Sequence, residues 1–416
     1  MSATSSKVWR QPDFIKLWAG QAISLLGSQV TLLALPLTAV LALHASAVQM
    51  GLLLAVGSAP ALLIGLFVGV LVDRVRRRPL LIGANLGRAA LLSLIPLAAL
   101  LRALRLEYLY LVAFLVGGLT VVFDVAYTSY LPILVDETQL VEGNSALEST
   151  SSLAGLAGPG LADLLVQALS APLAIGVAAL SFLLSALSLG LIGRRERVLP
   201  SPANRASIWG DMGEGLRVVI ETPTLRVLVG ASAIFNLFDS ALMGVYVLFI
   251  TRGLGLPPAV VGVVFTVGGV GGLCGALGAG WVANHLGLGR TLVGSVLLAA
   301  VAELCIALAH GPFVVAAAEA AVECGALVYG VNNVSLRQAL VSYRLQGRVN
   351  GTARFLSKGV IPIGAIVGGI VGDRYGLRAA VLIAGLGTLL AFAWIVLSPV
   401  RSLRGAPAPI EQSTRA

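Results

Sequence analysis

The chain has 416 residues, of which 57% are hydrophobic and only 11% are charged, and its mean hydropathy is +0.94. Soluble globular proteins carry about 25% charged residues, so this composition excludes that class and indicates a polytopic membrane protein. The net charge of +9 does not indicate nucleic-acid binding, because the basic residues collect in loops on one side of the expected spans. The bilayer is the expected partner, and no nucleic acid is expected.

Apolar runs long enough to cross a bilayer recur along the whole sequence, since about 20 helical residues span its ~30 Å hydrocarbon core. They predict an all-α membrane protein with twelve transmembrane helices joined mostly by short loops. The expected helices cover residues 14–43, 48–72, 80–101, 107–132, 143–168, 171–192, 224–250, 257–283, 290–309, 312–338, 351–373 and 377–398.

One long polar connection, with several Arg and Pro residues, divides these helices into two sets of six. A short amphipathic helix is expected within it, at residues 212–220 on the membrane surface. We therefore expect four regions, which are an N-terminal six-helix bundle over 1–192, a cytoplasmic central loop over 193–223, a C-terminal six-helix bundle over 224–400 and a cytoplasmic tail over 401–416.

The distribution of basic residues predicts the orientation in the membrane. Of the 28 Lys and Arg residues, twenty-one fall on the side that holds both termini and five on the other, and Arg88 and Arg337 lie within expected helices. By the positive-inside rule, both termini are expected in the cytoplasm of a prokaryotic cell, with the chain in its inner membrane. The first 16 residues lack the apolar core of a removable signal peptide.

The loop after the second expected helix carries a recognisable motif, Gly69-Val-Leu-Val-Asp73-Arg74-Val-Arg76-Arg77-Arg78-Pro79. The spacing Gly-x-x-x-Asp-Arg-x-x-Arg-Arg-Pro resembles the signature loop of the major facilitator superfamily. That resemblance implies a gating role for Gly69, Asp73, Arg74 and Arg78, with Gly69 allowing two helices to approach closely. Asp73 lies at the C-terminal end of its own helix, where the macrodipole disfavours an acid, so it needs a partner such as another helix N-terminus.

An internal repeat supports two bundles in parallel orientation. Five positions recur 211 residues later with the same residue or, for the last, an amide in place of the acid: Pro12, Gly51, Gly57, Gly69 and Asp73 match Pro223, Gly262, Gly268, Gly280 and Asn284. The second copy of the loop has lost its acid and most of its bases, so the halves are expected to contribute unequally to gating.

Other segments resemble the macrolide-efflux and enterobactin-exporter-like branch of drug–proton antiporters. They are Phe14–Gln21, Phe123–Pro132 and the run Gly347-Arg-Val-Asn-Gly351. Gly158 and Pro159 partly resemble the antiporter motif of the fifth helix, which implies a gating role, although a simple packing kink would also account for them. The substrate class implied is an amphipathic organic compound.

Ionisable residues inside the expected spans are candidates for coupling, because each costs roughly 2.5–3.5 kcal/mol at a helix centre. Asp239 is the first choice, since it lies near the middle of its helix in a polar and aromatic cluster. Glu319 and Glu323 are four residues apart and share a helix face. Asp124 and Arg88 either form a structural ion pair or belong to the coupling machinery. Interhelical hydrogen bonding is the alternative for all the acids.

Polar residues near these acids are expected to line a central cavity. Those on the helices that carry the acids, or on the matching helix of the first half, are Ser28, Gln29, Asn236, Ser240, Asn332 and Asn333.

No enzyme signature, metal site or cofactor motif is found. The three cysteines, Cys274, Cys305 and Cys324, lie in apolar runs without metal-ligand spacing. The expected function is secondary transport, as proton-coupled export of a small molecule by a monomer. The alternatives are a uniporter or importer of a small metabolite and, in another class, a non-transporting membrane sensor or scaffold.

Overall fold

The computed structural model describes residues 8–135, 139–193, 208–341 and 343–405, and within these ranges it contains helices but no strand. Twelve helices in this part of the chain are long and apolar enough to cross a membrane. The predicted fold class, an all-α membrane protein with twelve spans, is therefore confirmed.

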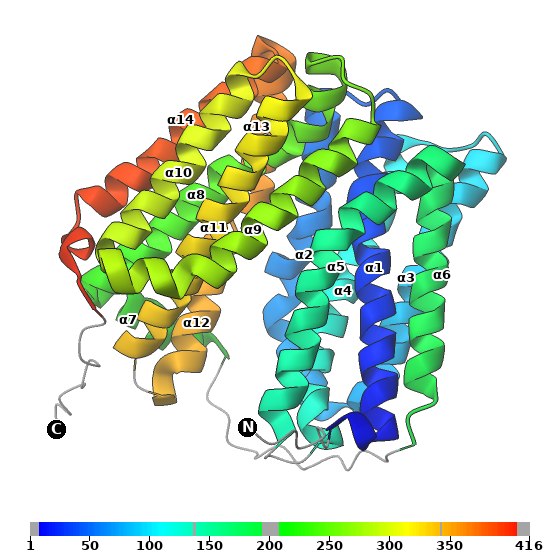
Figure 1. The fold of residues 1–416 in the computed structure, drawn as a ribbon. Coiled ribbons are helices and arrows are strands. Elements are labelled where there is room, and N and C mark those ends of the chain that lie inside the picture. The colour runs from blue at the N-terminus through cyan, green and yellow to red at the C-terminus, as the bar shows by residue number, and fades with distance from the viewer. Residues whose placement is uncertain (1–7, 136–138, 194–207, 342, 406–416) are drawn as a thin grey trace. The chain divides into compact units, whose positions relative to one another are not determined.

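The chain divides into two compact units, and the first comprises Met1–Ala45 and Val56–Ala203. Within it, α1 and α3 both pack against α6, α4 packs against α3, and α5 packs against α1 (Figure 1). Its core includes Phe14, Leu81 and Tyr130. The helices are α1 (Pro12–Leu41), α2 (Ala47–Arg74) from Val56 onward, α3 (Arg77–Leu100), α4 (Leu106–Leu134), α5 (Leu140–Leu169) and α6 (Ala171–Gly190).

The second unit comprises Asn204–Ala416 together with Ser46–Ala55, so the first turns of α2 belong to it. In this unit α11 packs between α9 and α10, and α8 packs against α13 and α14. Its helices are α7 (Ile208–Glu221), α8 (Pro223–Leu248) with a π-helical end at Phe249–Gly253, α9 (Ala259–Leu286), α10 (Leu288–Leu308), α11 (Pro312–Leu340), α12 (Tyr343–Lys358), α13 (Ile361–Tyr375) and α14 (Leu377–Val396).

The eleventh span departs from the prediction of one continuous helix over 351–373. The chain instead forms α12 and α13, which are separated at Gly359 and Val360. Pro362 occupies the first turn of α13, where its missing N–H costs nothing, whereas further inside a helix it would remove a hydrogen bond. The proline therefore starts a new helix.

The short helix expected in the central loop is present as α7, longer than predicted, and it packs against α12. Glu214 on α7 forms an ion pair with Arg348 on α12. Gly215 allows the close contact, since a β-carbon there would lie 2.7 Å from the Arg348 carbonyl oxygen. Two amphipathic helices thus lie together at one end of the second unit.

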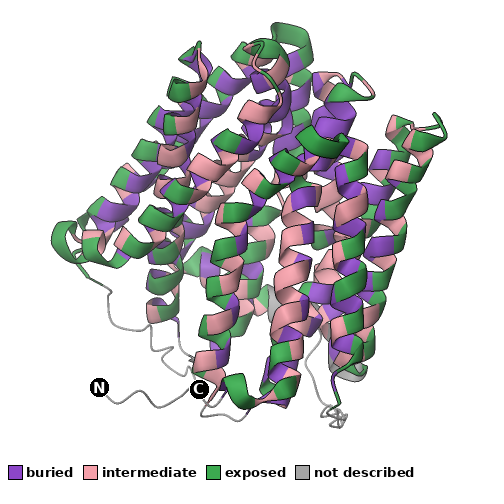
Figure 2. Ribbon diagram, turned by 45° about the vertical axis from the view of Figure 1, so that its right-hand side comes forward, coloured by how far each residue is buried: buried purple, intermediate pink, exposed green. Residues whose placement is uncertain are grey.

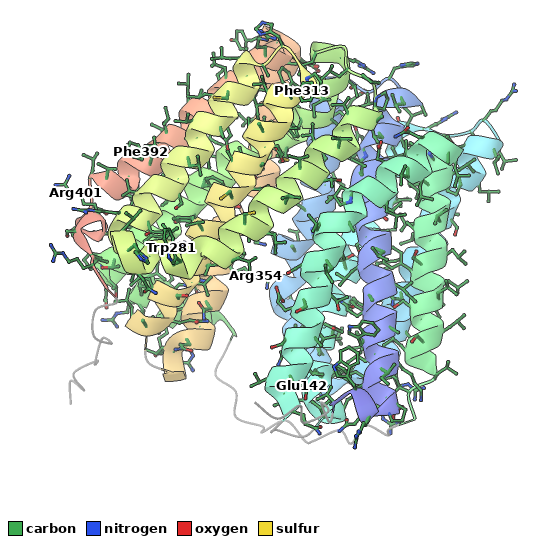
Figure 3. The ribbon with its side chains drawn as sticks, in the orientation of Figure 1. Glu142, Trp281, Phe313, Arg354, Phe392 and Arg401 are labelled. Carbon is green, nitrogen blue, oxygen red and sulfur yellow. The ribbon has the colours of Figure 1, made fainter. Side chains whose placement is uncertain are left out.

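Large apolar side chains are exposed along the sides of both units, as lipid-facing surfaces require (Figure 2). Leu97 and Leu187 in the first unit and Leu277 and Leu390 in the second are examples. In the second unit, Trp281 and Arg401 lie at the end that carries α7 and α12, and Phe313 lies at the opposite end (Figure 3).

Candidate functional site

Four carboxylic acids lie on three helices of the second unit, with Asp239 on α8, Glu303 on α10, and Glu319 and Glu323 on α11. Glu303 and Glu319 are fully buried, whereas Asp239 and Glu323 are partly exposed. Asp239 interacts electrostatically with all three glutamates. The structure therefore brings together the three acids that the sequence predicted for this half and adds a fourth.

Glu319 is held by a hydrogen bond from a distant tyrosine. The Tyr246 hydroxyl donates to Oε2 of Glu319 at 2.7 Å, and Oε1 has no partner. A glycine on α9 provides the space for this side chain, because a β-carbon at Gly268 would lie 2.8 Å from Cγ of Glu319. The glycine-rich face of α9 thus allows α11 to place two acids inside the unit.

Glu303 is the acid whose partner the sequence did not reveal. Its Oε2 accepts a hydrogen bond of 2.7 Å from the Thr388 hydroxyl on α14, and Oε1 is buried without a partner. Neither Tyr246 nor Thr388 was among the residues that the sequence predicted for the site. Their polar hydroxyl groups within apolar helices were the signal that could have found them.

No basic side chain balances this group of acids. Among the described residues, none of the four forms an ion pair with Lys, Arg or His. The acids also do not form a group able to hold a metal ion within the part of the chain that the structure describes. Four ionised carboxylates so placed would repel one another and lose much of their hydration. Binding of protons removes both the repulsion and the cost of desolvating the charges.

Arg88 forms a separate buried site in the first unit. Its guanidinium lies 4.4 Å from the ring centroids of both Phe123 and Phe182, donates to Oδ1 of Asn85, and reaches Ser24 Oγ at 3.5 Å. Asp124 is exposed and acts on Arg88 electrostatically, but the close contacts of Arg88 are with these neutral groups. Aromatic rings and neutral polar groups therefore surround Arg88 in the first unit, and its role with Asp124 stays a prediction.

The gating residues predicted in the signature loop are only partly described. α2 ends at Arg74 and α3 begins at Arg77, as a tight loop requires, but the side chains of Asp73 and Arg74 lie outside the described residues. Arg78 donates through Nε to the Leu189 carbonyl at 3.1 Å and through Nη2 to the Gly190 carbonyl. It therefore caps the C-terminus of α6, where a cation is favoured.

The two glycines predicted to gate behave differently. No described atom lies within 4 Å of a β-carbon placed on Gly69, so the close helix approach expected there is not present in this structure. Gly158 does provide close contact, because a β-carbon there would lie 2.5 Å from Cβ of Gln29 on α1. Pro159 is buried beside it on α5.

The residues expected to line a cavity divide into two groups. Ser28, Gln29 and Asn236 are partly exposed, which is compatible with a cavity wall. Ser240, Asn332 and Asn333 are only 3–4% exposed, and a place for them in a cavity wall stays a prediction. Asn333 donates to Ser232 Oγ on α8 at 2.8 Å and Asn332 to the Ala279 carbonyl on α9 at 3.4 Å, so both connect α11 to neighbouring helices.

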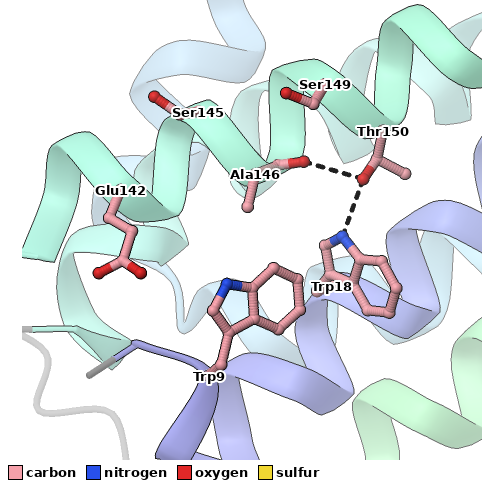
Figure 4. A pocket seen from close by; sticks show the side chains of 7 residues that line it. All are labelled: Trp9, Trp18, Glu142, Ser145, Ala146, Ser149 and Thr150. Carbon is pink, nitrogen blue, oxygen red and sulfur yellow. Dashed lines mark hydrogen bonds between the residues drawn. The ribbon is translucent and has the colours of Figure 1, made fainter. Parts of the chain in front are cut away.

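A pocket of about 390 Å³ lies on the first unit, away from all the predicted site residues (Figure 4). Trp9 and Trp18 meet edge to face in it, with ring centroids 5.1 Å apart. Trp18 Nε1 donates to Thr150 Oγ1 at 2.8 Å. Glu142, Ser145 and Ser149 of α5 complete the wall. Sequence reasoning did not anticipate this pocket.

Twelve helices able to span a membrane, in two compact units, define the class as a polytopic membrane protein. The family model of the Major Facilitator Superfamily matches residues 17–365 and, a second time, residues 228–414. The chain belongs to this superfamily, as the signature loop predicted, and is a multi-pass membrane protein and a transporter rather than an enzyme.

Two curated relatives are similar to most of the chain. Multidrug efflux pump Tap of Mycolicibacterium fortuitum is 28% identical, over 90% of this chain and 92% of its own length. Macrolide efflux protein A of Streptococcus pyogenes is 24% identical, over 94% of this chain and 96% of its own length. The second relative confirms the resemblance to macrolide-efflux proteins.

Solved structures show the same fold at low sequence identity. A crystal structure of the nucleoside transporter NupG has a TM-score of 0.77 and 13% identity, covering 92% of this chain and 98% of that one. A bacterial homologue of the iron transporter ferroportin, in an inward-facing state, has a TM-score of 0.74 and 17% identity, with coverage of 92% and 98%.

Proposed function

We propose that this transporter exports an amphipathic organic compound in exchange for protons, as a monomer working by alternating access. Export is supported by its two relatives, which are named as multidrug and macrolide efflux proteins. Proton exchange is supported by one observation, the group of Asp239, Glu303, Glu319 and Glu323 without a basic partner among the described residues.

The different exposure of these acids suggests separate tasks. Asp239 and Glu323 are partly exposed and can exchange protons with water, whereas Glu303 and Glu319 are sealed among helices. A proton on Asp239 removes its repulsion with the three glutamates of the group. A polar or cationic part of the substrate would compete with that proton for the carboxyl oxygens. Such competition enforces exchange if the transporter changes sides only with a proton or substrate bound.

Purified protein in liposomes provides the test. With the lumen more acidic by about two pH units, one-to-one electroneutral exchange should accumulate labelled ethidium, a permanent cation, about a hundredfold, since each unit is worth about 1.36 kcal/mol. A protonophore should abolish the accumulation and leave exchange down a concentration gradient intact. Accumulation that resists the protonophore contradicts proton coupling. Equilibration without accumulation identifies a uniporter, the alternative function.

The proposed location is the cytoplasmic membrane, with both termini in the cytoplasm. In a protein whose native cysteines are replaced, single cysteines at Arg76 and Ser402 should react with an impermeant maleimide only from the cytoplasmic side. Cysteines at Leu104 and Leu254 should react only from outside. This pattern follows from the excess of basic residues on the inner side. The reverse pattern would show that the chain is inserted the other way round.

A further inference from the structure

The motif Gly-x-x-x-Asp-Arg occurs a second time in the chain, on the opposite side of the membrane. Gly369-Ile-Val-Gly-Asp373-Arg374 has the same spacing as Gly69-Val-Leu-Val-Asp73-Arg74. The first copy ends the second span and the second copy ends the eleventh. Because successive spans alternate in direction, the two motifs lie on opposite faces, whichever orientation the protein takes.

Asp373 has a partner in the structure, and that partner is the N-terminus of α2. Its Oδ1 accepts a hydrogen bond of 2.8 Å from the backbone N–H of Ala47, and its Oδ2 accepts one of 3.2 Å from that of Val48. Ser46 Oγ donates to Oδ2 at 2.8 Å. A carboxylate near the C-terminus of its own helix is disfavoured, and the positive end of a second helix compensates.

The start of α2 has its own cap in addition to Asp373. Gln49 Oε1 accepts from the Ser46 N–H at 2.9 Å, and Gln49 N–H donates back to Ser46 Oγ at 3.4 Å, which forms a capping box. Only the N–H groups of Ala47 and Val48 depend on Asp373. If Asp373 leaves, water can reach both groups, because Asp373 is exposed. The contact is therefore able to break without unfolding α2.

Small residues bring α2 and α13 into contact next to this cap. A β-carbon at Gly369 would lie 2.6 Å from the Ala47 carbonyl oxygen, and one at Gly372 would lie 2.9 Å from Ala47 Cβ. Gly51 of α2 faces the Ala365 carbonyl in the same way, since a β-carbon on Gly51 would lie 3.1 Å from the carbon atom of that carbonyl. The first turns of α2 therefore pack on α13 and belong to the second unit.

We propose that Asp373 and the N-terminus of α2 form a latch that holds the outer side of the transporter closed. The contact lies within the second unit, and α2 continues from it into the first unit at Val56. Opening the outer side requires the first turns of α2 to leave α13, which breaks all three hydrogen bonds to Asp373. The inference rests on transport by alternating access and does not depend on the coupling ion.

A covalent latch provides the first test. In a background without native cysteines, Ser46→Cys and Asp373→Cys are joined by a short bifunctional thiol reagent with a reducible linkage. Counterflow of labelled erythromycin should be lost on cross-linking and restored by reduction, because the outer side can no longer open. Each single-cysteine protein with the same reagent is the control. Counterflow that continues in fully cross-linked protein overturns the proposal.

Removal of the acid provides the second test, with a readout that does not require transport. Nitroxide labels at Ala42 and Tyr375 report the separation of the outer ends. Asp373→Ala should shift the distance distribution toward longer values, and Asp373→Glu, which keeps the charge, should shift it less. Glu107→Gln removes an acid from the first turn of α4, at the expected outer side, and should not shift it. An unchanged distribution in Asp373→Ala overturns the latch.

Failure of the latch and failure of proton coupling are distinguishable. Counterflow needs no proton gradient, so the cross-link should stop it even if another ion drives transport. Conversely, loss of accumulation with a protonophore would still be observed if the outer side closes by other contacts.

Discussion

Asp239→Asn is expected to abolish proton-driven accumulation while leaving counterflow of the same substrate at least partly intact. The amide keeps the size of the side chain and most of its hydrogen-bonding ability, but it cannot bind or release a proton. Asp239 interacts with the other acids of its group and, unlike the buried Glu319, is partly exposed, so its loss removes a member that can exchange protons with water. The accumulation of about a hundredfold expected for two pH units should disappear, which leaves equal substrate concentrations on the two sides of the membrane.

The matched control is Asp163→Asn in the first unit. Asp163 is also an intramembrane acid, 6% exposed, and it accepts a hydrogen bond of 2.7 Å from Gln167 of its own helix. Replacement of Asp163 should leave accumulation unchanged, because the side chain that it contacts, Gln167, is neutral. Accumulation is measured in liposomes for both variants at matched protein content.

Glu323→Gln decides between the two partly exposed acids of the group. If Asp239→Asn accumulates substrate normally and Glu323→Gln does not, the titrating group lies on α11 and the first choice is wrong. If both variants accumulate substrate normally, these carboxyl groups are structural. The coupling must then be sought at Asp124 and Arg88 in the first unit.

The sequence was sufficient to predict the spans, because each needs only a long apolar run. It was not sufficient to predict that the eleventh span would divide at Gly359. Arg354 and Lys358 make residues 351–358 more polar than the apolar run after them, but a polar stretch can begin a span as well as form a separate helix. Pro362 can likewise either bend a helix or begin one. The contact of α7 with α12 favours the division of this span, because it holds α12 at the end of the unit.

The candidate site shows a similar limit. The spacing of Glu319 and Glu323 predicts a shared helix face, since it depends on one helix alone. Tyr246 and Thr388 lie 73 and 85 residues from the acids to which they donate, so only the packing of helices reveals them. Asn332 and Asn333 were expected in a cavity because polar residues in a span suggest water. A helix contact can satisfy the same amides, and the composition does not distinguish the two environments.

Replacement of Gly271 is expected to destabilise the second unit, because this glycine allows the close contact between α9 and α11. A β-carbon there would lie 2.6 Å from both Cα and the carbonyl carbon of Ala320. These are backbone atoms, so no change of side-chain rotamer can remove the clash. α9 must move away from α11, and overpacking of this kind costs typically about 1–3 kcal/mol. Ala320 lies next to Glu319, so the displacement should also disturb the acid group and reduce transport.

Gly278→Ala provides the control on the same helix, because no described atom lies within 4 Å of a β-carbon at that position. The two variants receive the same side chain on α9, so intrinsic helix propensity changes equally and only the contact differs. The measurement is the temperature at which half of the detergent-solubilised protein is lost from the monodisperse fraction. Gly271→Ala should lower this temperature, Gly271→Val should lower it further, and Gly278→Ala should leave it unchanged or raise it. Equal stability of Gly271→Ala and Gly278→Ala would show that α9 and α11 are not in close contact at Ala320. The placement of Glu319 and Glu323 beside the glycine face of α9 would then have to be abandoned.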